Sequence, residues 1–241
     1  MNKLVRCIGL VLLSLSTCSA QAAEETAYKF TTGLYALSGG GLSNSHGLDI
    51  NVRQSSELGN IWAAWYRSPE QEVSQPRIGW DKSFEASHWR VMPSVQTASG
   101  GFIGGSLSVE TGDAFFAGAG LGRTNLHPYV NLNFDPNDAW MASVGYRWSS
   151  LQSVSVQVVR DNRKNPDQQH LHLLYRTPMP EGERLTVDVL FKSGLVEDRM
   201  VHRTGLSLTY DFAQFFTRIA YDPVINFTPQ TMWRVSLGQR F

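Results

Sequence analysis

Two histidines in this sequence, His170 and His172, have a spacing that could support metal chemistry. They lie two residues apart in "HLHLLYR", so on an extended strand both side chains point to the same side. With His202 from a later segment they could bind a transition metal, because imidazole is a common ligand of such ions. Spacing on strands alone is weak support, and we interpret the pair as polar residues beside the connector "DNRKNPDQQ". We therefore predict no metal site and no cofactor.

Hydrolytic chemistry is a second possibility. A serine hydrolase needs a histidine beside its nucleophile and a carboxylate or amide that orients the histidine. His46, His88 and His127 show no His-x-Ser arrangement, and "NSHG" at 44–47 is more typical of a loop. "DPND" at 135–138 is typical of a turn rather than a pair of catalytic carboxylates. We predict no enzyme activity, and a lipid-modifying Ser/His hydrolase stays as an alternative.

Two further motifs are excluded by their context. "GAGLG" at 118–122 lacks the strand-to-helix setting of a dinucleotide site. The basic run "RDNRK" at 160–164 is short and carries no interleaved aromatic residues, so it does not indicate nucleic-acid binding. We expect no nucleic-acid partner.

The largest set of residues with binding chemistry is basic. In "RLTVDVLFK" apolar residues alternate with Arg184, Thr186, Asp188 and Lys192, so the charges share one face. Arginine suits carboxylates, because its planar guanidinium can donate two parallel hydrogen bonds to them. The basic residues that the alternation places on the polar face are Lys29, Arg53, Arg77, Arg90, Arg147, Arg176, Arg184, Lys192, Arg203, Arg218, Arg234 and Arg240. The acidic residues on the same face are Asp49, Asp81, Glu110, Asp188 and Asp222.

The elements that must position these residues are short alternating strands. The period of two recurs through most of the chain, and polar connectors with Gly or Pro separate the segments. The clearest predicted strands are 27–37, 47–56, 60–67, 75–83, 88–97, 151–160, 168–177, 184–193, 200–211, 214–222 and 231–241.

Such a pattern fits either a soluble sandwich or a transmembrane barrel. The segments have about ten residues, the length that crosses a bilayer at a tilt. Aromatic residues collect near the ends of the apolar faces, as in interfacial girdles. A sandwich core could not hold the charged face without severe cost. The predicted fold is therefore all-β, an antiparallel transmembrane β-barrel.

The number of strands is less well determined. A closed single-chain barrel of this kind needs an even number, and the length favours 12 strands, with 14 as the alternative. The ambiguity lies at 98–135, in a Gly-rich stretch that could hold two or three strands or a loop folded into the pore.

The first residues predict export. Residues 1–22 combine Lys3 and Arg6 with a short apolar run and an "AQA" cleavage pattern, so we predict a signal peptide and one barrel domain over 23–241. Lipidation at Cys18 is the rival interpretation. Both cysteines precede residue 23, so we expect neither a disulfide nor a cysteine metal site after it. The alternating end "MWRVSLGQRF" predicts an outer-membrane protein, with Phe241 recognised by the assembly machinery.

The charge balance suggests what passes through the barrel. After Lys3 and Arg6 are removed from 21 basic residues, 19 remain against 21 acidic ones, yet the predicted lumen holds twelve basic and five acidic residues. A narrow lumen lined by one sign of charge concentrates ions of the opposite sign. We expect a monomeric channel in outer-membrane lipid that passes small anionic solutes. A closed structural barrel filled with ion pairs is a further alternative.

The layout also resembles a known family. The length, the signal, the short turns and the terminal aromatic residue are similar to the small monomeric porins specific for acidic oligosaccharides, the oligogalacturonate type. The segment "LHPYVNLNFDPNDAWMASVGYRW" at 126–148 is similar to a mid-barrel hairpin of that family. The resemblance implies a twelve-stranded barrel with arginine tracks that carries acidic oligosaccharides. The Gly-rich segment at about 100–122 departs from the family pattern.

Overall fold

The structure, a computed structural model, describes residues 27–41, 43–133 and 135–241. The predicted signal peptide at 1–22 and the alternative lipidation site Cys18 lie outside the described residues. The strands are β1 (Ala27–Ser38), β2 (Ser45–Ser56), β3 (Gly59–Ser68), β4 (Val73–Asp81), β5 (Phe84–Ala86), β6 (Trp89–Ala98), β7 (Phe102–Gly112), β8 (Phe115–Thr124), β9 (Ala139–Arg147), β10 (Ser153–Asp161), β11 (Gln169–Pro178), β12 (Arg184–Val196), β13 (Arg199–Asp211), β14 (Phe215–Asp222) and β15 (Thr231–Arg240). Three 3₁₀ turns join some of them, η1 (Ser99–Gly101), η2 (Pro180–Gly182) and η3 (Ile225–Phe227).

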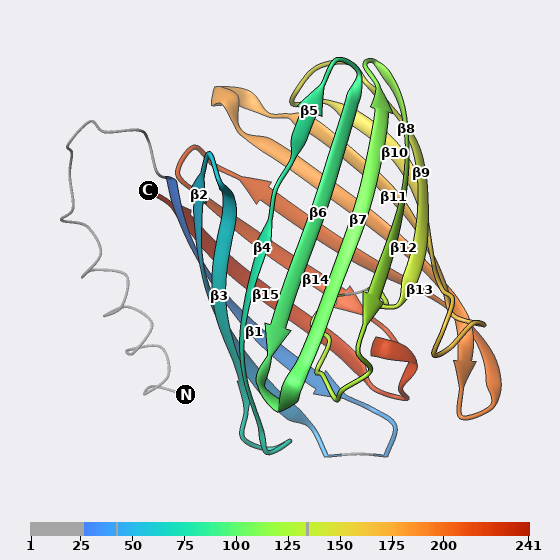
Figure 1. The fold of residues 1–241 in the computed structure, drawn as a ribbon. Helices are drawn as coiled ribbons and strands as arrows, with labels where there is room; N and C mark the ends of the chain where they lie inside the picture. Colours follow the sequence, from blue (N-terminus) through green and yellow to red (C-terminus); the bar gives the residue numbers. More distant parts are fainter. Residues whose placement is uncertain (1–26, 42, 134) are drawn as a thin grey trace.

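The strands form one closed antiparallel barrel (Figure 1). β1 pairs with β15 in the register Lys29↔Arg240, which joins the two ends of the sheet. Beyond β15, the backbone N–H of Phe241 donates to the Tyr28 carbonyl at 2.9 Å. The prediction of an all-β antiparallel barrel is therefore confirmed. Within the described part of the chain, no helix is long and apolar enough to cross a membrane.

The barrel has 14 strands, so the preferred prediction of 12 was wrong and the alternative was right. β4 and β5 both pair with β6, and they form one strand interrupted at residues 82–83. The interruption faces Pro93 of β6, whose carbonyl accepts from the Lys82 N–H at 3.3 Å. Proline has no N–H to return a bond, so the ladder breaks there.

The two uncounted strands lie in the Gly-rich stretch, where the alternation is hidden. Inward positions of β7 and β8 are occupied by Gly104, Gly118, Gly120 and Gly122. Glycine has no side chain, so these positions are neither polar nor apolar and show no alternation in the sequence. The first half of the expected hairpin at 126–148 is not a strand: the described residues 125–133 and 135–138 form an inward loop, and only β9 is a strand. That part of the family resemblance was wrong.

Apolar side chains cover the outside of the barrel. Outward positions on almost every strand expose large apolar residues, among them Leu34, Val52, Ile78, Val95, Ile103, Leu107, Val144, Val156, Ile219 and Val235. Aromatic contacts lie near both ends of the strands, such as Phe212 with Phe215 at 4.1 Å and Tyr221 with Trp233 at 4.8 Å between ring centroids. This exterior fits a hydrocarbon layer bounded by aromatic girdles.

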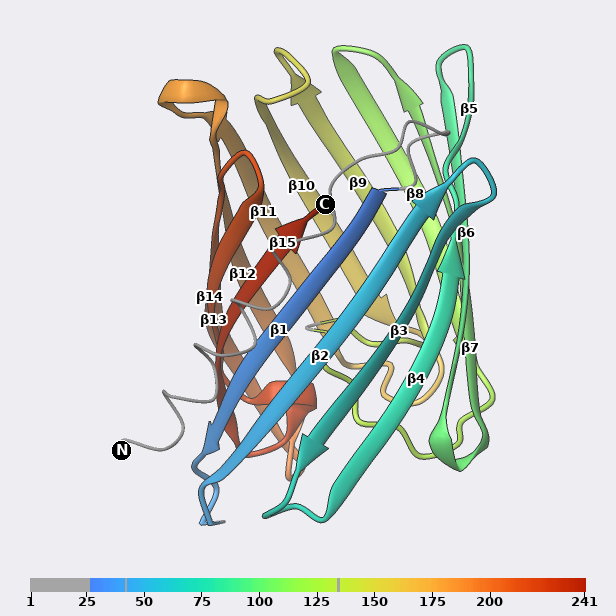
Figure 2. The ribbon, with the colours of Figure 1, turned by 90° about the vertical axis from the view of Figure 1, so that its left-hand side faces the viewer.

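The two ends of the barrel differ in their connections. The longest connections, 125–138, 162–168 and 223–230, all lie at one end, which is the lower end in Figure 2. At the other end, short turns such as 57–58, 87–88 and 113–114 join the strands. Barrels of the outer membrane carry short turns on the periplasmic side and longer loops outside. We refer to the two ends as the turn end and the loop end.

Candidate functional site

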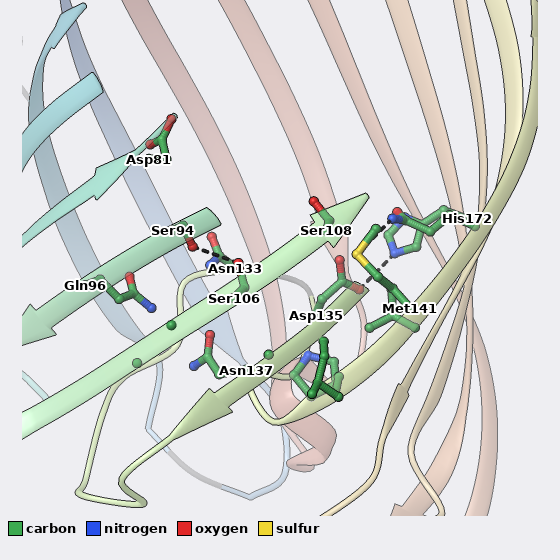
Figure 3. Close-up of a pocket in the computed structure, with 18 of the residues that line it drawn as sticks. Asp81, Ser94, Gln96, Ser106, Ser108, Asn133, Asp135, Asn137, Met141 and His172 are labelled. Carbon is green, nitrogen blue, oxygen red and sulfur yellow. Dashed lines mark hydrogen bonds and ion pairs between the residues drawn. The ribbon is translucent and has the colours of Figure 1, made fainter. Parts of the chain in front are cut away.

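The lumen contains a cavity of about 620 Å³. On one of its walls, formed by β6 to β8, the inward side chains that line the cavity are neutral and small or polar, including Ser94, Gln96, Ser106 and Ser108. Arg123 near the end of β8 also borders the cavity and donates to the Asn162 side chain at 2.7 Å. The hydroxyls of Ser94 and Ser106 are hydrogen-bonded at 2.7 Å, as Figure 3 shows. The inward glycines of β7 and β8 lie beside these residues. Because glycine projects nothing inward, this wall leaves open space in the barrel.

The wall across the barrel is basic. Arg218 on β14 and Arg234 on β15 line the cavity, and in the closed strand order these strands lie opposite β7 and β8. Arg176 on β11 lines it as well. Among the described residues, neither Arg176 nor Arg218 forms an ion pair; the Arg218 Nε donates to the Thr209 hydroxyl at 2.9 Å. The cavity therefore has a cationic side and a neutral side.

Six of the other predicted arginines are paired with carboxylates. Arg53 binds Asp81 at 3.1 Å, Arg90 and Arg147 share Glu110 at 3.4 and 3.0 Å, Arg184 binds Asp211 at 2.9 Å, and Arg77 and Arg240 bind Asp49 and Asp211. Asp211 was missing from the predicted acidic set, although it lies at an inward position of β13. These pairs stiffen the wall and cancel much of its charge.

The last three predicted residues, Lys29, Lys192 and Arg203, lie away from the cavity. The Lys29 ammonium lies 4.4 Å from the centre of the Phe216 ring. Lys192 is completely buried and binds Asp222 at 2.7 Å, with the carbonyls of Pro223 and Val224 at 3.2 Å. Arg203 is exposed near the loop end and donates to the carbonyl of its neighbour His202. Lys192 thus holds the connection between β14 and β15 in place and does not face the cavity.

The described parts of the connection between β8 and β9, 125–133 and 135–138, reach across the lumen from β4 to β11 and form the inward loop. On one side, Gln75 of β4 donates to the Val130 carbonyl at 3.0 Å and accepts from its N–H at 2.8 Å. Leu132 is buried in an apolar cluster with Tyr35, Tyr66 and Met232 from the barrel wall. The loop is therefore held by the Gln75 side-chain amide, which bonds both polar backbone groups of Val130, and by the buried side chain of Leu132.

On the far side, the loop passes directly over a glycine. A Cβ atom at Gly122 of β8 would overlap the carbonyl oxygen of Asn137. Only glycine allows the loop backbone to lie this close to the wall. The Gly-rich stretch therefore supplies two strands and also makes room for the inward loop. The sequence had left both open, two or three strands and a loop folded into the pore.

Two histidines bind the middle of the loop. The Asp135 Oδ1 accepts hydrogen bonds from His170 Nδ1 at 2.8 Å and from His172 Nε2 at 2.9 Å. On its other side, His172 Nδ1 lies 3.0 Å from Asp188. Figure 3 shows Asp135 and His172 pointing toward each other across the edge of the cavity. His202, the third ligand considered from the sequence, lies on the outward face of β13, the face that also carries Leu206.

The histidines change the acidity of the loop carboxyl. Burial alone would raise the pKa of Asp135, but the hydrogen bonds from His170 and His172 outweigh it and hold that pKa below its ordinary value. Asp135 therefore stays ionised and keeps its two bonds at neutral pH. Sequence reasoning took this residue for a turn former, because nothing local links it to a strand 35 residues away.

In the part of the chain that the structure describes, the histidine ring nitrogens with hydrogen-bond partners contact carboxylates or a backbone carbonyl, and no serine hydroxyl.

Comparisons with known proteins support the fold. No protein-family model matches the sequence, and no curated protein matches it. The crystal structure of the outer-membrane protein Omp33 of Acinetobacter baumannii overlaps with a TM-score of 0.54 at 9% identity, over 91% of this chain and 100% of that chain. An outer-membrane channel from Pseudomonas putida F1 overlaps with a TM-score of 0.49 at 11% identity, over 92% and 97% of the two chains.

At such low identity the likeness to Omp33 shows the fold alone. The fold shown is a closed antiparallel β-barrel, and its apolar exterior fits a barrel that lies in the outer membrane.

Proposed function

We propose that this protein is an outer-membrane channel for small anionic solutes. One observation carries the proposal: the lumen cavity is lined by Arg176 and Arg218, which form no ion pair among the described residues. Four arginines line the cavity, Arg123, Arg176, Arg218 and Arg234, against three carboxylates, Asp81, Asp135 and Asp188, and Asp81 is already paired with Arg53. The uncompensated charge in the cavity is therefore positive.

The low-dielectric wall of a barrel strengthens this charge. Field lines from the arginines concentrate in the narrow lumen, so anions enter it more readily than cations. The neutral wall offers hydroxyl and amide groups opposite the arginines. A solute with both carboxylates and hydroxyls could contact both walls, which supports acidic oligosaccharides as one class of solute. We also propose that the barrel works as a monomer and that Phe241 guides its assembly.

Single-channel recording tests the proposal. The refolded barrel is placed in a planar bilayer between tenfold different concentrations of potassium chloride, and the reversal potential gives the anion-to-cation permeability ratio. We expect discrete steps and a ratio above one. Arg218→Gln should lower the ratio severalfold, because it removes a cavity charge that forms no ion pair among the described residues.

The matched control is Arg67→Gln. Arg67 lies at an outward position of β3 with its guanidinium over the ring of Trp65, so its charge is outside the lumen. This variant should keep the wild-type permeability ratio. A folded wild-type barrel that conducts no current would contradict the proposal and favour the closed structural barrel, in which the inward loop blocks the lumen.

A further inference from the structure

The inward loop separates two cavities. The 620 Å³ cavity lies on one side, and a second cavity of about 210 Å³ lies on the other, among the connections of the loop end. Pro136 and Asn137 line both cavities, His172 lines the first and His170 the second. The Asp135 carboxylate joins the two histidines at this partition. Whatever fixes Asp135 therefore fixes the wall between the two cavities.

The three side chains have the composition of a metal site. One ligand atom from each of Asp135, His170 and His172 can be chosen so that all three lie within 4.8 Å of one another. Two imidazole nitrogens and one carboxylate oxygen suit zinc-class divalent ions, which prefer nitrogen donors, and not calcium or magnesium, which prefer oxygen. Zinc binds these atoms at about 2.0–2.2 Å.

The nearby residues orient one ligand in the way that metal sites require. Asp188 lies 3.0 Å from Nδ1 of His172 and accepts its proton, which leaves Nε2 directed at Asp135. A carboxylate behind a histidine sets its tautomer and makes the other nitrogen a stronger ligand. His170 is also restrained, since its ring stacks on Phe227 with 5.5 Å between centroids. Both imidazoles are buried and held on adjacent positions of one strand face.

We propose that Asp135, His170 and His172 form a binding site for a zinc-class divalent ion that fastens the inward loop to β11. The ion takes the place of the Nε2 proton of His172, which is released, while the Nδ1 proton of His170 moves to Nε2, because a neutral imidazole keeps one proton when its other nitrogen binds a metal. Two ligands come from a rigid strand and the third from the loop. Metal binding therefore holds the partition in place. The site does not depend on the solute that the channel passes.

Direct metal titration tests the site. Zn²⁺ is added to the refolded, detergent-solubilised full barrel in a calorimeter, and Co²⁺ binding is followed by its visible absorption. We expect one ion per chain, with at least tenfold weaker binding in His172→Gln, His170→Gln and Asp135→Asn. Asp188→Asn should weaken binding about 10- to 100-fold, because it acts through the orientation of His172. The shift in gel mobility on heating shows whether each variant is folded.

The control uses another histidine–carboxylate pair. His88 and Asp113 lie 2.8 Å apart in exposed turns but have no second imidazole, so His88→Gln should bind Zn²⁺ like the wild type. A second readout is chymotrypsin cleavage within 125–138, which Zn²⁺ should slow in the wild type but not in Asp135→Asn. Equal Zn²⁺ affinity in the wild type and the three ligand variants would overturn the proposal. So would unchanged cleavage of the wild type with Zn²⁺ bound. Neither result depends on whether the barrel conducts ions.

Discussion

Lys192 and Asp222 form an ion pair that is sealed from solvent: the lysine Nζ lies 2.7 Å from Oδ1 of the aspartate, and neither side chain has any exposed surface. The same ammonium binds two carbonyls of the connection that follows β14. A residue that looked like part of a pore lining thus fastens the connection between β14 and β15 to the barrel wall.

Removing the lysine should destabilise the barrel. Lys192→Met leaves the Asp222 carboxylate buried without its counter-charge, and we expect the free energy of unfolding to fall by about 3–5 kcal/mol. Urea unfolding followed by tryptophan fluorescence measures it. Arg203→Met is the control, because Arg203 is the register partner of Lys192 on β13 but is exposed. A loss of the same size in both variants would contradict the role of the buried pair.

Arginines that line the cavity should affect ion selectivity more than arginines outside it. Arg184 is the first residue of β12 and lies outside the cavity lining, where it shares Asp211 with Arg240. Arg218 lines the cavity and forms no ion pair among the described residues. We expect the permeability ratio to fall more in Arg218→Gln than in Arg184→Gln, as measured by reversal potentials in the same salt gradient. The opposite order would show that the cavity arginines do not control selectivity.

A single methyl group at Gly122 should displace the inward loop. Gly122→Ala places Cβ where the Asn137 carbonyl oxygen lies, and such overpacking costs about 1–3 kcal/mol unless the loop moves. We expect faster chymotrypsin cleavage within 125–138 and a changed single-channel conductance. Gly105→Ala on the neighbouring strand is the control, since a Cβ there meets one backbone oxygen at 3.2 Å. If both variants resist cleavage like the wild type, the close approach at Gly122 does not position the loop.

The Gln75 side chain should hold the inward loop through its amide group and not through its volume. Gln75→Leu keeps the volume but leaves the N–H and carbonyl of Val130 without their partner, at about 1–3 kcal/mol for each buried group. The loop should then detach more often, visible as more frequent transitions between conductance levels. Gln75→Glu keeps the acceptor and loses the donor, so we expect an intermediate effect. A Gln75→Leu channel as steady as the wild type would argue against this anchor.

The barrel itself could be predicted because its signal is local. On a strand, side chains alternate between two faces, so the row Arg234, Ser236, Gly238 and Arg240 had to lie opposite Trp233 and Val235. The same rule placed Arg176 and Arg218 on the inner face. It failed at β7 and β8, where glycine at the inward positions carries no polarity, and the strand count was therefore too low.

The sequence by itself determined the fold class, the strand faces and the excess of inward basic residues, because each depends on neighbours two residues apart. Only the tertiary structure decided which arginines are neutralised, because pairs such as Arg184 with Asp211 depend on the register between strands. It also decided that Asp135 meets His170 and His172. That contact requires a loop to fold back across a closed barrel, and no spacing along the chain encodes it.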